Sequence, residues 1–205
     1  MTQGQIVRGS NFGEIIYNLA KREDVKNIVE IGTWYGLGST KCVIDGIIES
    51  KENKNFISVE LYPEMYDTAK NNLKDYLTYV NILNGSIIDY DDMFWFDFEE
   101  NKKKFAFEKS WYNNDLEKIK NCKNVLSEMP EYIDLLILDG GEFSTYPEWH
   151  KLKDRVKIVV LDDTNVFKCF GIVEELLKDE NYQSLIIVKD DRNGFCIFEN
   201  KKYVK

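Results

Sequence analysis

The residues best able to do chemistry stand where apolar runs end. Ile28 to Thr40 reads IVEIGTWYGLGST, an apolar run followed by a glycine-rich turn and a helix start. In an open α/β sheet such a turn brings backbone N–H groups and a helix N-terminus to the edge where ligands bind. Glu30 stands just before the turn, where its carboxylate can accept from an ammonium group. Besides Glu30, the residues we expect to contact a ligand are Gly32, Thr33, Trp34, Tyr35, Gly36, Gly38 and Ser39.

A second carboxylate, Glu60, closes the next apolar run and is followed by Leu61. A carboxylate at that edge can accept from both ribose hydroxyls of an adenosine. Each feature has a plain alternative, since a glycine turn can exist without a ligand and an acid at a strand end is often a solvated cap. Together the two features favour a nucleoside ligand.

Three further acids follow two later apolar runs. Asp139 ends one run, and Asp162 and Asp163 end the next, with Asn165 close behind. Neighbouring strand ends would bring these oxygens together, and such a group could hold Mg²⁺ against two vicinal hydroxyls of a substrate. Asp163, Thr164 and Asn165 are also good N-caps for a following helix, so the sequence leaves metal binding open.

These residues are positioned by an alternation of β-branched runs and amphipathic stretches, which predicts an α/β fold with a parallel sheet between helices. The last two runs are joined by a short polar turn, Lys189 to Gly194, and should form an antiparallel hairpin. The expected strands are 27–31, 55–59, 79–83, 133–138, 157–161, 184–188 and 195–198. Helical spacing is seen in Val43, Ile44, Ile47 and Ile48, in Met65 to Leu73 after Pro63, and in Phe170, Val173, Leu176 and Leu177.

The stretch from Tyr90 to Glu131 is too long for a single crossover and predicts an insertion. It opens with the aromatic string Phe94 to Phe98, which would fill a satellite core beneath a loop or form a lid over a substrate. Lys102 to Lys104 should be solvated. A helix near its end is indicated by Leu116, Ile119, Cys122, Val125 or Leu126, and Met129.

Length and charge limit the function. The 205 residues suit one domain, 1–205, and 27 basic against 36 acidic residues give a net charge of -9, which disfavours nucleic acid and anionic membranes as partners. We expect a cytoplasmic protein, because no membrane-spanning run or secretory signal is visible. Cys42, Cys122, Cys169 and Cys196 should be reduced core thiols. His150 is the only histidine, which excludes sites that need a histidine pair, and a surface or structural role is expected for it.

Taken together, these segments resemble the class I S-adenosylmethionine-dependent methyltransferases, most closely the small O-methyltransferases of the catechol and macrolide-sugar type. The resemblance covers about Asn11 to Asn200, apart from the insertion, and is carried by Glu30 to Gly38, Glu60, Asn84 to Ser86 and Asp139 to Tyr146. It implies a doubly wound, mostly parallel, seven-stranded sheet with helices on both faces and a C-terminal antiparallel hairpin. It further implies that the glycine loop contacts the methionine part of the cofactor, that Glu60 holds the ribose, and that Gly85 and Ser86 lie beside the adenine. Asp139 is also expected to contact the cofactor.

The resemblance implies an enzyme that methylates a hydroxyl of a small polyhydroxylated acceptor, most plausibly a sugar, with assistance by Mg²⁺ at Asp139, Asp162 and Asp163 left open. The candidate catalytic residues are Glu142, as general base, and Asp139. A carboxylate at Glu142 departs from the histidine or lysine that the family often has there, while Tyr146 would orient a hydroxyl or simply pack. Open alternatives are a catechol-like phenol acceptor, a non-catalytic nucleoside-binding module and a nicotinamide-dependent oxidoreductase. The oxidoreductase fits less well, because the tight GxGxxG spacing of nicotinamide-binding proteins is absent and three residues separate Gly32 from Gly36. Homo-oligomerisation is left open.

Overall fold

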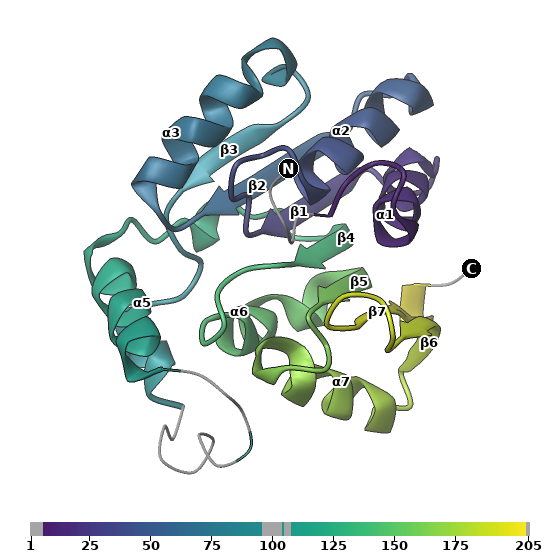
Figure 1. Cartoon of the computed structure of the whole chain (residues 1–205). Helices are drawn as coiled ribbons and strands as arrows, with labels where there is room; N and C mark the ends of the chain where they lie inside the picture. The colour runs from purple at the N-terminus through teal and green to yellow at the C-terminus, as the bar shows by residue number, and fades with distance from the viewer. Residues whose placement is uncertain (1–5, 96–103, 105–107, 204–205) are drawn as a thin grey trace.

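The computed structural model describes residues 6–95, 104 and 108–203. Its centre is a seven-stranded sheet in the order β3-β2-β1-β4-β5-β7-β6 (Figure 1). The strands are β1 (Asn27–Ile31), β2 (Asn55–Glu60), β3 (Asn81–Asn84), β4 (Ile133–Leu138), β5 (Val156–Asp162), β6 (Tyr182–Val188) and β7 (Phe195–Asn200). The first five strands pair in parallel, while β7 pairs antiparallel with both β5 and β6. All seven expected strands and the terminal hairpin are therefore confirmed, with boundaries shifted by up to two residues.

Helices cover both faces of the sheet. The helices are α1 (Asn11–Lys21), α2 (Ser39–Ser50), α3 (Pro63–Asn72), α5 (Lys109–Asn121), α6 (Thr145–Leu152) and α7 (Phe167–Lys178). Short 3-10 turns occur at η1 (Lys74–Tyr76), η2 (Tyr90–Trp95), η3 (Leu126–Glu128), η4 (Lys153–Arg155) and η5 (Lys201–Tyr203). One core lies between the sheet and α1 to α3, and the other lies between the sheet and α5 to α7. The doubly wound fold is thus confirmed.

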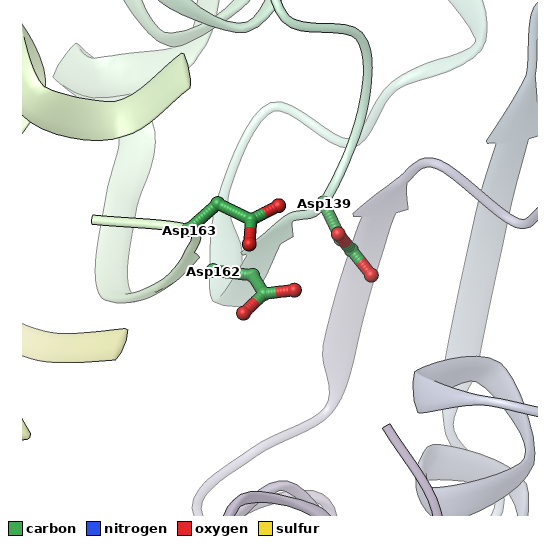
Figure 2. Close-up of side chains that lie close together, drawn as sticks. All are labelled: Asp139, Asp162 and Asp163. Carbon is green, nitrogen blue, oxygen red and sulfur yellow. The ribbon is translucent and has the colours of Figure 1, made fainter. Parts of the chain in front are cut away.

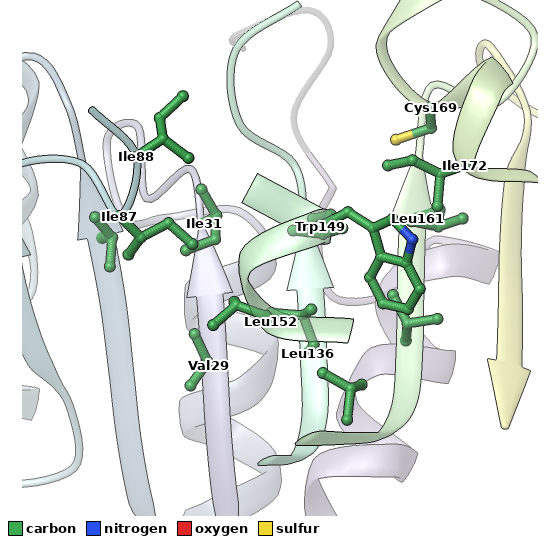
Figure 3. Close-up of a cluster of buried hydrophobic side chains, with 14 of the residues drawn as sticks. Val29, Ile31, Ile87, Ile88, Leu136, Trp149, Leu152, Leu161, Cys169 and Ile172 are labelled. Carbon is green, nitrogen blue, oxygen red and sulfur yellow. The ribbon is translucent and has the colours of Figure 1, made fainter. Parts of the chain in front are cut away.

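Each strand contributes apolar side chains to both cores, because successive side chains of a strand point to opposite faces. In β1, Ile28 packs toward α1 and α2, whereas Val29 and Ile31 pack on the other face. Figure 3 shows Trp149 and Leu152 of α6 lying over this second face. Both side chains are buried, so α6 is held firmly over the centre of the sheet.

Helix α1 was not predicted as a separate element, although its start carries a signal. The Ser10 hydroxyl caps it by accepting from the backbone N–H of Gly13 at 3.1 Å. Phe12 and Ile16 follow at helical spacing and are fully buried.

The expected helices are confirmed at α2 and α7, although not all of the apolar residues that indicated them are buried. In α7 the buried face carries Cys169, Ile172 and Leu176, whereas Phe170 and Leu177 are exposed. In α2, Ile48 is likewise exposed. Several apolar residues on each helix fit more than one helical stripe, and contact with the sheet selects the stripe that is buried.

The insertion forms the expected helix, but α5 ends at Asn121. Cys122, Val125 and Met129 lie beyond it because Asn124 forms a parallel bridge with Ser86 at the end of the sheet. Trp95 ends η2, but the side chains of Phe94 and Trp95, all of Phe96 to Phe98, and Lys102 and Lys103 lie outside the described residues. Lys104 is exposed.

The four cysteines are free, and three of them are buried while Cys122 is half-buried. This agrees with the prediction of reduced thiols in the core. Burial raises the pKa of the Cys42 thiol to about 12, so this sulfur is a packing group at neutral pH.

Candidate functional site

The glycine loop is fixed at the carboxyl edge of the sheet by backbone hydrogen bonds. The N–H of Gly32 donates to the carbonyl of Val59 at 2.9 Å, and the N–H of Asp139 donates to Ile31 at 2.9 Å. Gly32 has a φ of +101°, and a Cβ there would lie 2.2 Å from the carbonyl oxygen of Asp139. Only glycine therefore lets β1 turn this closely past the end of β4.

Glu60 faces the same loop. Its Oε2 accepts from the backbone N–H of Trp34 at 2.7 Å, and its Oε1 accepts from that of Tyr62 at 2.9 Å. The side chain is buried, which raises the pKa of its carboxyl, while the two backbone donors oppose that rise. Each oxygen keeps a second lone pair, so a carboxylate fixed in this way can still accept from hydroxyl groups of a ligand.

Between the loop and Glu60 opens a cavity of about 450 Å³. This volume is in the range of small-molecule sites, roughly 300–1,000 Å³. The predicted residues on its wall are Gly32, Thr33, Trp34, Gly38, Ser39, Glu60, Leu61, Gly85, Asp139, Glu142 and Asp163. The two ends of the predicted nucleoside site thus share one cavity.

Glu30 requires a correction, because it does not line the cavity. Its carboxylate is fully buried below the loop and accepts from the hydroxyls of Ser39, Thr40 and Ser58, each at 2.6 Å. Burial raises the pKa of this carboxyl, and the three hydroxyls oppose the rise. Glu30 therefore holds the start of α2 against β1 and β2, and it is not placed to receive an ammonium group.

Three more predicted contacts also lie off the cavity wall. Gly36 packs toward the side chain of Leu73. The backbone of Ser86 pairs with the segment after α5, donating to the carbonyl of Lys123 at 3.0 Å. Tyr35 likewise does not line the cavity. A linear motif marks the whole loop, whereas only one side of a loop can face a ligand.

The three aspartates come together as the strand ends predicted. Figure 2 shows Asp139, Asp162 and Asp163 at adjacent strand ends, and one carboxylate oxygen of each lies within 4.8 Å of the others. The capping alternative is wrong, because none of Asp163, Thr164 and Asn165 is the N-cap of α7. The N-cap is Val166, and its side chain makes no capping hydrogen bond. Asp139 and Asp163 line the cavity, but Asp162 does not.

Cations of the chain itself already lie among these acids. The Lys168 ammonium on α7 is 2.8 Å from Asp139 Oδ1 and 2.6 Å from Asp163 Oδ2, and Arg192 is 2.9 Å from Asp162 Oδ2. Burial lowers the pKa of the ammonium, but the aspartates outweigh it and hold that pKa well above its usual value. Burial and the neighbouring Asp139 raise the pKa of Asp162 to about 7.

Glu142, the candidate base, lies on the cavity wall and also acts as a cap. Its Oε1 accepts from the backbone N–H of Lys168 at 3.2 Å, in the first turn of α7. Burial raises the pKa of its carboxyl, and Lys168 opposes the rise. Tyr146 does not line the cavity, and its hydroxyl donates to Glu175. His150 is exposed, 3.2 Å from Glu175, in the surface role expected of it.

Sequence reasoning missed several polar residues of the wall. They are Tyr62, Asp115, Ser144, Glu148, Lys168 and Arg192. Asp115 comes from α5, and its Oδ1 accepts from the Tyr62 hydroxyl at 2.7 Å, so the insertion supplies part of the site. Tyr62 and Ser144 lie next to predicted site residues and could have been included. Nothing in the sequence distinguishes Asp115 from other acids on a helix.

Glu148 is one of the buried acids of this wall. Its side chain lies on α6, and among the described residues its Oε2 has no hydrogen-bond partner. Burial and the nearby Asp115 raise its pKa to about 8. The folded protein therefore holds this carboxyl protonated at neutral pH, whereas the unfolded chain would ionise it near 4.5.

This shift predicts a pH-dependent loss of stability. Because the folded state binds the proton more tightly, stability is full below about pH 4.5 and falls as the pH rises through about 8. Glu148 alone should lower the free energy of unfolding by about 1.4 kcal/mol per pH unit within that window. Asp162, whose pKa is raised to about 7, contributes a fall of the same sign. Glu148→Gln should therefore make the fall shallower by about 1.4 kcal/mol per pH unit, measured by urea denaturation across the same pH range. Glu117→Gln on the exposed face of α5 is the control, and equal slopes for wild type and Glu148→Gln would contradict the assignment.

No model of a protein family matches this sequence, and no curated protein matches it. Solved structures do. The S-adenosylhomocysteine-bound methyltransferase PaMTH1 of Podospora anserina is 14% identical, with a TM-score of 0.62 over 93% of this chain and 78% of that one. An O-methyltransferase of Bacillus cereus in complex with S-adenosylhomocysteine is also 14% identical, with a TM-score of 0.61 over 93% and 80%.

The O-methyltransferase TomG of Streptomyces achromogenes, in complex with S-adenosylmethionine, is 12% identical, with a TM-score of 0.58 over 92% of this chain and 79% of that one. The chain has the methyltransferase fold. Identities this low establish the fold alone. Among the described residues, every helix is too short or too polar to cross a membrane.

Proposed function

We propose that this protein is an S-adenosylmethionine-dependent O-methyltransferase. The observation that carries the proposal is the single cavity bounded by the glycine loop, Glu60 and the acids that follow β4 and β5. The loop and Glu60 suit the amino-acid tail and the ribose of the cofactor. The methyltransferase fold, found in proteins crystallised with S-adenosylmethionine or S-adenosylhomocysteine, supports the same cofactor.

The charges of the wall fit this donor. Six acidic residues line the cavity against two basic ones, namely Glu60, Asp115, Asp139, Glu142, Glu148 and Asp163 against Lys168 and Arg192. Five acidic residues remain when Glu148, which is protonated at neutral pH, is set aside. A sulfonium and an ammonium give the cofactor two positive charges against one carboxylate, so an acid-rich cavity attracts it. Methyl transfer then requires an acceptor oxygen in line with the sulfonium carbon and a base for its proton.

We propose a small polyhydroxylated acceptor, such as a sugar. Carboxylates accept hydrogen bonds from hydroxyl groups, and several of them surround the end of the cavity formed by Asp139, Glu142 and Asp163. Assistance by Mg²⁺ at Asp139, Asp162 and Asp163, which the sequence left open, would require Lys168 to leave two of these carboxylates. The direct test is formation of S-adenosylhomocysteine from S-adenosylmethionine over a panel of sugars, polyols and catechols. Turnover confined to catechols would replace the sugar proposal with the phenol alternative.

Glu142 is the proposed base, and its replacement separates catalysis from capping. Glu142→Gln keeps an oxygen that can accept from the N–H of Lys168 but cannot take a proton. We expect kcat to fall about 10²–10⁴-fold, with little change in the melting temperature or in S-adenosylhomocysteine binding. Glu174→Gln, an exposed residue of α7, is the control. An unchanged kcat in Glu142→Gln would remove the residue from the mechanism.

The capping contact of Glu142 favours one other function, a module that binds the nucleoside without transferring a methyl group. A carboxylate already engaged by α7 fits such a role. Binding of S-adenosylhomocysteine without turnover of any acceptor in the panel would support the module. Turnover of any acceptor would exclude it.

A further inference from the structure

The Lys168 ammonium is a buried cation located where the three aspartates converge. Its side chain is 5% exposed, and it projects from the first turn of α7 to contact Asp139 and Asp163. Asp163 also accepts from the side-chain amide of Asn193 at 3.0 Å, and Arg192 contacts Asp162. Each of the three carboxylates thus already has a cationic partner within the chain.

Mg²⁺ does not fit among these residues while Lys168 is in place. The ion binds carboxylate oxygens at about 2.0–2.1 Å and needs near-octahedral geometry. Asp139 Oδ1 and Asp163 Oδ2 are contacted by the ammonium, so an ion at the same oxygens would meet a buried positive charge at close range. Displacing Lys168 would leave that charge without a partner on the wall of the cavity, which is strongly unfavourable.

Asp162 Oδ1 is the one fully buried oxygen of this cluster without a hydrogen-bond partner among the described residues. It cannot serve as the anchor of a metal site in the cavity, because Asp162 does not line the cavity and its other oxygen contacts Arg192. A single buried oxygen also falls short of the several oxygen ligands that a divalent cation needs.

We propose that the Lys168 ammonium takes the place of a divalent cation in this site and that the protein binds no metal there. An ammonium has three N–H donors, and Asp139 and Asp163 receive two of them. Lys168 also lines the cavity beside Glu142, so its third donor can hold an acceptor oxygen while the base removes the proton. This second role rests on the proposed function, whereas the exclusion of metal rests on the contacts alone.

The test measures metal binding with Mn²⁺ alone and no methyl donor. Electron paramagnetic resonance of free Mn²⁺ should show no binding to the wild type at concentrations up to about 1 mM. Lys168→Met removes the ammonium and should acquire one Mn²⁺ site with a Kd at least tenfold below that limit. Lys157→Met is the matched control, because Lys157 is also a nearly buried lysine paired with an aspartate, Asp24, but it lies at the start of β5.

A second variant tests the proposal if Lys168→Met does not fold. Lys168→Met combined with Asp163→Asn removes one positive and one negative charge, so the cluster keeps its net charge and two carboxylates plus an amide oxygen remain. This double variant should also bind Mn²⁺. Binding of Mn²⁺ by the wild type, with loss in Asp139→Asn, would overturn the proposal, as would a folded variant without Lys168 that still binds none.

The acceptor-holding role has its own readout. In wild type, a chelator should leave turnover unchanged. Lys168→Met should raise the KM for the acceptor and lower kcat, while the Kd for S-adenosylhomocysteine changes less than threefold. Turnover lost in chelator and restored by Mg²⁺ would overturn the proposal while leaving the O-methyltransferase function intact. Absence of any turnover would contradict the proposed function alone, because the Mn²⁺ experiment does not depend on turnover.

Discussion

Gly32→Ala is expected to destabilise the protein by about 3–5 kcal/mol, combining a strained left-handed backbone with an overlap inside a packed region. The added Cβ would lie 2.2 Å from the carbonyl oxygen of Asp139. Neither partner can yield, because the backbone on each side is held by the ladder between β1 and β4 and by the Gly32 N–H bond to Val59. Urea denaturation measures the change in the free energy of unfolding.

Gly9→Ala is the matched control for this prediction. Gly9 also has a positive φ, +88°, but a Cβ there would meet nothing within 4 Å. It should therefore show only the backbone cost, about 1–2 kcal/mol. The difference between the two variants isolates the contact between the loop and the end of β4. Equal effects would mean that the loop does not pass β4 as closely as the structure has it.

Glu60→Gln is expected to weaken S-adenosylhomocysteine binding by about 100-fold. A hydrogen bond to a charged group is worth about 1.5–3 kcal/mol, and a tenfold change in affinity corresponds to about 1.4 kcal/mol. The amide also turns its NH₂ group toward one of the two backbone donors, from Trp34 or Tyr62, that the carboxylate now satisfies. Isothermal titration calorimetry gives the Kd directly.

The control for Glu60 is Glu64→Gln in the first turn of α3, where the carboxylate is 57% exposed and does not line the cavity. Its Kd should stay within twofold of wild type. Melting temperatures measured without ligand show whether Glu60→Gln loses affinity or merely loses folded protein. A Glu60→Gln protein that folds and binds as tightly as wild type would remove Glu60 from the ligand site.

Features that depend on neighbouring strand ends were predictable from the sequence. The carboxyl ends of parallel strands share one edge, so the glycine loop, Glu60 and the three aspartates had to meet once β1, β2, β4 and β5 were recognised. The terminal hairpin followed in the same way from the short polar turn after Val188. In each of these cases a local sequence pattern determines the position of the segment in the fold.

Side chains that arrive from a helix were not predictable in this way. Lys168 reads as an ordinary polar residue on a helix, and its burial depends on which stripe of α7 meets the sheet. Asp115 reaches the wall only because α5 packs back beside Tyr62. The error at Glu30 is related, since three hydroxyls from α2 and β2 satisfy a carboxylate that the motif alone assigns to a ligand. These placements depend on tertiary packing, which local patterns do not specify.

We expect the cavity between the glycine loop and Glu60 to bind the S-adenosyl group. Calorimetric titration of the wild-type protein with S-adenosylhomocysteine, and separately with NAD, tests it most directly. We predict one site per chain with a micromolar Kd for S-adenosylhomocysteine and no heat of binding with NAD. Binding of NAD with no response to S-adenosylhomocysteine, or no response to either compound by a folded protein, would show that this cavity does not bind the S-adenosyl group.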